Sequence, residues 1–237
     1  MLRFLTCVAV MSLLANPVAG DDAASVFYDP VERKIEGWTV AVDPKLLNEQ
    51  NGEVADRALT ALANHLQRIT YIVPAERLAE LQQLRIWLDL SHDLKSMQYH
   101  PSAGWLTKNG YDPRLAKHVH IPQAAALTDP KMWAKHPYVV LHELAHAYHD
   151  QVLGFDHAEI KAAWDHAKET GILEDVLLFT GKRVEHYGLT NHKEYFAEST
   201  EAYFGVNDFY PFVRAELREH DPRMFETLKR IWGPVAE

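Results

Sequence analysis

The chain has 237 residues, of which 47% are apolar and 24% are charged, a balance that is ordinary for one globular domain with a substantial core. Its formal net charge of -9 argues against nucleic acid or an anionic membrane as a partner, because a surface that binds phosphates is basic. Nothing in the sequence indicates an oligomeric state.

Residues 1–20 have the pattern of a secretory signal peptide. The basic residue Arg3 precedes an apolar run over 4–15, and small residues follow it. This run is too short to cross a bilayer, and no later segment is long and apolar enough to do so. We therefore predict cleavage near Gly20 and a secreted or periplasmic protein. The only cysteine, Cys7, lies inside this segment, so the mature chain would be stabilised without disulfides.

The remaining residues, 21–237, contain no repeat and no flexible linker, so we predict a single domain of the α+β class. Apolar and polar residues alternate in four segments, which predicts the strands of a small mixed sheet over 35–42, 85–90, 98–106 and 118–121. Apolar residues at helical spacing predict helices over 51–73, 75–83, 137–153, 158–169, 191–204, 211–219 and 222–232. A sheet-rich part (about 21–125) is therefore followed by a helix-rich part (about 126–237).

A His-Glu-Leu-Ala-His motif occupies residues 142–146, within the helix predicted over 137–153. Because a helix places residues i and i+4 on one face, the imidazoles of His142 and His146 would point the same way. Two imidazoles suit zinc, and the carboxylate of Glu143 would be placed to take a proton from an attacking water. We interpret the histidines as metal ligands and Glu143 as a general base.

The alternative is a hydrogen-bonded histidine pair in a core helix, because a chain with 14 histidines can contain such a motif by chance. The neighbouring residues Val140, Leu141 and Leu144 are apolar, so the polar cluster should be buried only if it is paired or metal-bound. This context favours the metal site.

A catalytic zinc site needs a third protein ligand and an open position. The metzincin pattern requires glycine and histidine at positions that hold His149 and Val152, so that class is excluded. Glu169 lies at a thermolysin-like distance from the motif but lacks the expected acidic partner, and Glu174 is similarly unsupported.

The better third ligand is Glu194, which shares one helix face with Glu198. One carboxylate can bind the metal while the other accepts the second N–H of a ligating histidine, which we expect to be Glu198 behind His142. Glu201 extends this face, and we expect it to be solvated or to assist rather than to bind metal. The alternative is that the whole acidic face is solvated.

Residues 187–198, which read Tyr-Gly-Leu-Thr-Asn-His-Lys-Glu-Tyr-Phe-Ala-Glu, together with 142–146 resemble the anthrax lethal factor family of gluzincin zinc metallopeptidases. The resemblance implies a zincin-like catalytic domain, Glu194 as third ligand and Tyr187 as the donor to the oxyanion of the reaction. It covers only these two segments. The chain has nothing like the toxin's large accessory domains, so toxin activity and its substrates are not implied.

The function that we expect is a zinc-dependent endopeptidase acting on an extended peptide or protein. One alternative is an exported zinc- or peptide-binding module without turnover, against which the intact Glu143 counts. Another is hydrolysis of a non-peptide amide, such as a cell-wall bond. The ligand set would also accept cobalt, nickel or manganese.

Zincin folds present an edge strand to the peptide, and either 99–105 or 118–121 could supply it. The alternative is that Tyr99 and Trp105 only pack in the core. Three further histidines lie near the predicted site in sequence. We expect His149 to be hydrogen-bonded or exposed rather than a fourth ligand. For His186 and His192, a surface position is the main expectation and a substrate-facing role the alternative.

Overall fold

A five-stranded mixed sheet lies in the first half of the computed structural model, which describes residues 27–235. The signal peptide predicted over 1–20 lies outside the described residues. The strands are β1 (Val31–Ile35), β2 (Trp38–Val42), β3 (Arg85–Leu88), β4 (Gln98–Tyr99) and β5 (His118–Ile121), in the order β1-β2-β3-β5-β4. β2, β3 and β5 are parallel, while β1 and β4 are antiparallel at the two edges. The predicted α+β class and small mixed sheet are confirmed.

Two of the predicted strands are wrong in extent. The segment 35–42 is not one strand, because Glu36 and Gly37 adopt φ angles of 48° and 97° and turn the chain into a β1–β2 hairpin. The segment 98–106 is a strand only at Gln98 and Tyr99, and the chain then forms the helix α3 (Ala103–Lys108). Leu106 is the buried residue of this helix. The apolar residues of this segment therefore belong to a helix and not to a strand.

Helices cover one face of the sheet. The long helix α1 (Gly52–Ile72) places Leu62, Leu66 and Ile69 in the main core at helical spacing. They join alternate strand residues, including Ile86 and Leu88. Two further helices of this half are α2 (Ala75–Leu81) and α4 (Pro130–Lys135). The last of these was not predicted, and Asp129 caps it by accepting from Lys131 N–H at 2.9 Å.

The opposite face of the sheet has a smaller apolar cluster of its own, formed by Ala41, Trp87, Leu106 and Leu115. Side chains alternate between the two faces along a strand. His120 therefore points to this second face, while its neighbours Val119 and Ile121 belong to the main core.

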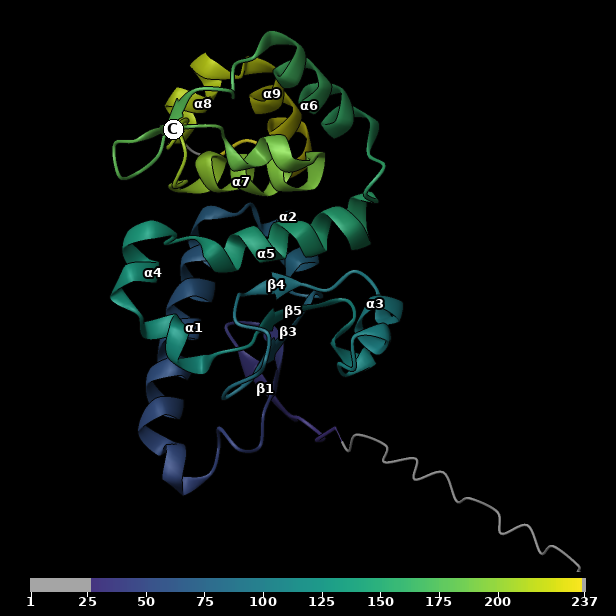
Figure 1. Ribbon diagram of the computed structural model, residues 1–237, viewed down its shortest axis with the longest axis vertical. Coiled ribbons are helices and arrows are strands. Elements are labelled where there is room, and N and C mark those ends of the chain that lie inside the picture. Colours follow the sequence, from purple (N-terminus) through teal and green to yellow (C-terminus); the bar gives the residue numbers. More distant parts are fainter. Residues whose placement is uncertain (1–26, 236–237) are drawn as a thin grey trace, which may run out of the picture.

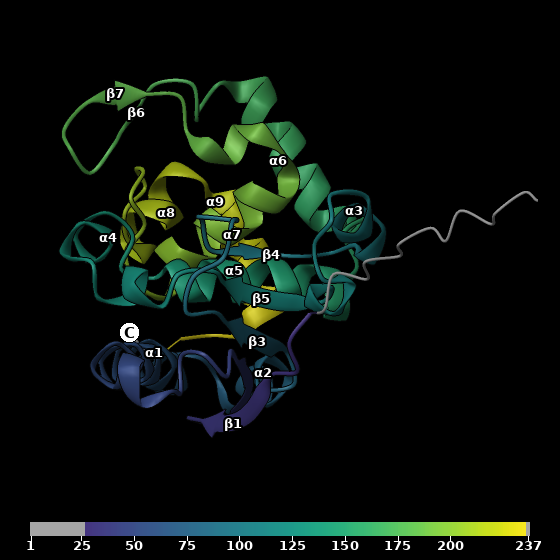
Figure 2. The same cartoon turned by 60° about the horizontal axis from the view of Figure 1, so that its bottom comes forward.

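The second half of the chain is mostly helical. Its helices are α5 (Val139–Tyr148), α6 (Ala158–Thr170), α7 (His192–Phe204), α8 (Arg214–His220) and α9 (Pro222–Trp232). Figure 1 shows α5 between the sheet and α7, with α6, α8 and α9 beyond α7. A hairpin of β6 (Val176–Leu177) and β7 (Arg183–Val184) stands apart from the main sheet (Figure 2). Among residues 27–235, no helix is long and apolar enough to cross a membrane.

Candidate metal centre

The helix α5 carries the His-Glu-Leu-Ala-His motif through the middle of the molecule. Nine of its ten residues are buried, His146 being the partial exception. After Tyr148 the helix widens into a π-helical turn over His149–Leu153, and Gly154, with φ of 80°, ends it. The predicted helix over 137–153 is thus present, but it begins later and changes its winding after the motif.

The helix α7 brings the predicted third ligand to the same place. The side chain of Asn191 caps this helix by accepting from the N–H groups of Lys193 and Glu194 at 2.9 and 3.1 Å. Glu194 therefore lies in the first turn, where the helix dipole favours a carboxylate. All residues from Tyr195 to Phe204 are buried, so the alternative of a solvated acidic face is wrong.

Three ligand atoms meet where α5 faces the start of α7. The Nε2 atoms of His142 and His146 are 3.1 Å apart, and Glu194 Oε2 lies 3.4 Å from the first and 3.2 Å from the second. A tetrahedral zinc ion with ligands at about 2.0–2.2 Å separates them by about 3.3–3.6 Å. The three residues are thus a group that could hold a metal ion.

The hydrogen-bonding pattern of this trio calls for a positive charge at its centre. His142 Nδ1 donates to Glu201 Oε1 at 2.7 Å, so a neutral His142 has only a lone pair at Nε2. The single N–H of a neutral His146 cannot donate both to this lone pair and to the carboxylate of Glu194. Burial would lower the pKa of His142, but hydrogen bonds to Glu194 and Glu201 raise it well above its usual value. A bound cation would supply the same positive charge as a second proton on His142.

Glu201, rather than Glu198, is the carboxylate behind His142. Glu201 Oε1 accepts from both His142 Nδ1 and His136 Nε2 at 2.7 Å, whereas Glu198 Oε1 lies 3.8 Å from His142 Nδ1. The prediction that Glu198 holds this place is therefore corrected, and Glu201 is fully buried instead of solvated. Its spacing of two helical turns from Glu194 could have suggested this role. Nothing in the sequence singled out His136.

The second carboxylate oxygens of Glu198 and Glu201 are both buried without a hydrogen-bond partner. Burial raises the pKa of Glu198 to about 8. Burial would also raise the pKa of Glu201, but the contact with His136 lowers it below its usual value. Burial thus favours the protonated form of Glu198, whereas Glu201 stays ionised beside His136 and His142.

The trio opens into a cleft of about 630 Å³. Glu143 and Tyr187 line this cleft together with the three ligand residues. Burial raises the pKa of the Glu143 carboxyl, and the charge of Glu194 raises the pKa of the Tyr187 hydroxyl. Tyr187 is 48% exposed, and it lies at the solvent-accessible side of the cleft lining.

The remaining histidines lie outside this cleft. His149 is fully buried, and neither of its ring nitrogens has a hydrogen-bond partner, so it is neither exposed nor hydrogen-bonded as expected. His186 is also buried and accepts from Gly188 N–H at 2.9 Å, which corrects the expected surface position. His192 is partly buried and lies 2.7 Å from the carbonyl oxygen of Phe155.

A scan against protein-family models, a search of curated proteins and a search of solved structures find no match to this chain.

Proposed function

We propose that the protein is a zinc-dependent endopeptidase with a zincin-like catalytic domain. The observation that carries the proposal is the convergence of His142, His146 and Glu194 in one cleft with the carboxylate of Glu143. These three residues would hold the zinc ion. Zinc would supply Lewis acidity, polarising a carbonyl oxygen and making water more acidic.

Each of the other residues would have a task that its surroundings support. A buried carboxyl with a raised pKa is a stronger base near neutral pH, so Glu143 would accept the proton of the attacking water and pass it to the leaving amine. The hydroxyl of Tyr187 would donate to the developing oxyanion. Glu201 would hold the imidazole of His142 in one orientation through its 2.7 Å hydrogen bond.

The edge strand β4 favours an extended peptide over other amides. β4 pairs with β5 and lies at the end of the sheet order, so its other edge can accept a further strand. Gln98 and Tyr99 of β4 line the same cleft as Glu143. The Tyr99 hydroxyl donates to Asp150 Oδ2 at 2.6 Å, which ties β4 to the end of the metal helix. Of the two candidate edges, 118–121 is an interior strand.

Cleavage of an unbiased peptide library by the zinc-loaded mature protein, read by mass spectrometry, tests the proposal. We expect cleavage that is abolished both by a chelator and by Glu143→Gln, while the variant keeps its zinc. Glu174→Gln is the matched control, because Glu174 is exposed and lies outside the cleft lining. Silence from a wild-type protein that holds zinc would contradict peptidase activity. It would favour a binding module or a non-peptide amide substrate.

A further inference from the structure

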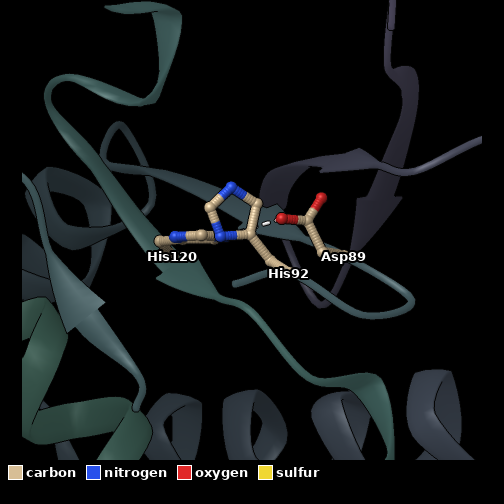
Figure 3. Close-up of side chains that lie close together, drawn as sticks. All are labelled: Asp89, His92 and His120. Atoms are coloured by element: carbon tan, nitrogen blue, oxygen red, sulfur yellow. Dashed lines mark hydrogen bonds and ion pairs between the residues drawn. The ribbon is translucent and has the colours of Figure 1, made fainter. Parts of the chain in front are cut away.

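A further group of residues that could hold a metal ion lies on the other face of the sheet and is formed by Asp89, His92 and His120 (Figure 3). Asp89 directly follows β3, His92 lies in the loop between β3 and β4, and His120 is in β5. One ligand atom from each residue lies within 4.8 Å of the others. We propose that this far-face cluster is a second metal site, which takes Zn²⁺ or a similar divalent ion and fixes the loop that leads to β4.

The far-face cluster is separate from the cleft. Val119 and Ile121 point into the main core that α5 shares, so His120 between them points away from it. Trp87, the register partner of His120 on β3, belongs to the apolar cluster of that second face. The proposal therefore does not rest on peptidase activity.

The two buried members of the cluster already have the outer hydrogen bonds that metal ligands need. Asp89 Oδ1 accepts from the Tyr28 hydroxyl, and from Trp87 Nε1 at 3.1 Å, which leaves Oδ2 for an ion. His120 Nδ1 lies 3.0 Å from His100 Nε2.

An ion can enter with the loss of few contacts. Without metal, His120 Nε2 donates to Asp89 Oδ2 at 2.7 Å. When an ion takes that place, the proton of His120 is carried on Nδ1 and is donated to His100 Nε2, whose own proton moves to its Nδ1. Both imidazoles stay neutral and no net proton is lost, so the exchange is balanced.

His92 is the adjustable ligand. Its ring stands at 86° to that of His120, with the centroids 4.9 Å apart, and its Nδ1 accepts from Leu94 N–H at 3.1 Å. Ligation costs this one hydrogen bond, because the ring must turn or the accepting nitrogen must change partner. The side chain is partly exposed in an exposed loop, so it can move and water can fill the fourth position.

The site would support one rim of the cleft. The loop that contains His92 continues through Lys95, Ser96 and Met97, which line the cleft, and then enters β4. An ion at the base of this loop would fix its course from the far side of the sheet. The far-face cluster itself is not part of the cleft lining, so we assign the ion a structural role and not a catalytic one.

Zinc titration of the metal-free mature protein, with metal counted by mass spectrometry after dialysis, tests the second site. We expect about two ions per chain in the wild type, one in His92→Ala, one in His146→Ala and none in the double variant. His118→Ala is the matched control, because His118 lies on β5 outside the trio, with Nδ1 2.9 Å from the carbonyl oxygen of Ala116.

Two results would overturn the proposal: a His146→Ala protein that binds no zinc, or a wild type whose zinc content His92→Ala leaves unchanged. If His92→Ala fails to fold, Asp89→Asn in the His146→Ala background gives the same test. There we expect Co²⁺ absorption bands in the His146→Ala protein that Asp89→Asn removes. Peptidase activity enters none of these readouts, so this site can fail while the proposed function stands.

Discussion

Two clusters of the same composition, two imidazoles and one carboxylate, lie on opposite sides of the sheet. In the cleft centre, the three ligand atoms of His142, His146 and Glu194 are all 3.1–3.4 Å apart. In the far-face cluster, His120 and Asp89 instead form a direct hydrogen bond of 2.7 Å. The ligand atoms of the first trio are thus nearly equidistant from one another, which leaves a central position for an ion. In the second trio, a direct hydrogen bond joins two of the three residues.

The difference shows that ligand composition alone does not decide chemistry. The cleft centre opens into a space of about 630 Å³ beside the buried carboxyl group of Glu143. The far-face cluster lies outside that space and has Trp87, Tyr28 and His100 as its hydrogen-bonding neighbours. A metal ion in the cleft centre could contact a substrate, whereas a metal ion in the far-face cluster could have only a structural role. Four experiments on variants test this difference.

The largest effect should come from Glu194→Ala. Loss of the third ligand should remove the cleft ion and reduce kcat/KM for a cleaved peptide on the order of 10³-fold or more. Asp89→Asn, the corresponding change in the far-face cluster, should keep the cleft ion and most of the activity. Zinc content and peptide kinetics of both variants check this. A Glu194→Ala protein that keeps its cleft zinc would contradict the ligand assignment.

Tyr187→Phe should have the next largest effect, and it should separate chemistry from metal binding. An oxyanion donor acts in the transition state, so its loss should lower kcat about 10²–10³-fold while zinc content stays unchanged. Steady-state kinetics beside a metal assay measure both quantities. An unchanged kcat would show that this hydroxyl does not take part in the reaction.

The local parts of the cleft centre were predictable from the sequence. The motif on α5 and the cap and first turn of α7 depend on spacing within single helices, and both helices were predicted. The order of the carboxylates was not predictable in the same way. Whether Glu198 or Glu201 meets His142 depends on the rotation of α7 against α5, which helical periodicity does not fix.

The far-face cluster was not predictable, because its members come from separate elements. Asp89 and His120 meet through the parallel register of β3 and β5, and His100 joins them because it directly follows β4, which pairs with β5. The alternation of apolar and polar residues was a poor guide there. It missed both the turn at Glu36 and Gly37 and the helix α3, since short segments fit either period.

Glu201→Gln should weaken zinc binding at the cleft centre more than Glu198→Gln does. Glu201 accepts from His142 Nδ1 at 2.7 Å, whereas Glu198 is 3.8 Å away. Loss of the charged acceptor behind a ligating histidine costs about 10–100-fold in metal affinity. Competition with a chromophoric chelator gives both values. The reverse order would restore Glu198 to the role first expected for it.

The smallest expected effect is on the pH dependence of stability of the metal-free protein. Its sign differs between His142 of the cleft centre and His100 beside the far-face cluster. The pKa of His142 is raised by its carboxylate partners, so its contribution to stability is present below the unfolded pKa of about 6.5 and is lost as pH rises through the folded pKa. Burial lowers the pKa of His100 to about 3. His100 therefore binds a proton in the unfolded chain but not in the folded protein, so the stability falls as pH drops below about 6.5.

His100→Gln should remove this acid-sensitive part, while the amide can still donate to His120 Nδ1. Between pH 7.5 and 5, the variant should lose about 1–2 kcal/mol less unfolding free energy than the wild type, because the slope approaches about 1.4 kcal/mol per pH unit. Urea unfolding of both metal-free proteins measures the difference, with His166→Gln on the partly exposed side of α6 as control. Equal losses would mean that His100, the hydrogen-bonding neighbour of the far-face cluster, accepts a proton in the folded protein. The hydrogen bond between His120 and Asp89 would then be only one of several protonation arrangements of the far-face cluster. The cleft centre would differ from that cluster only by the open space beside Glu143.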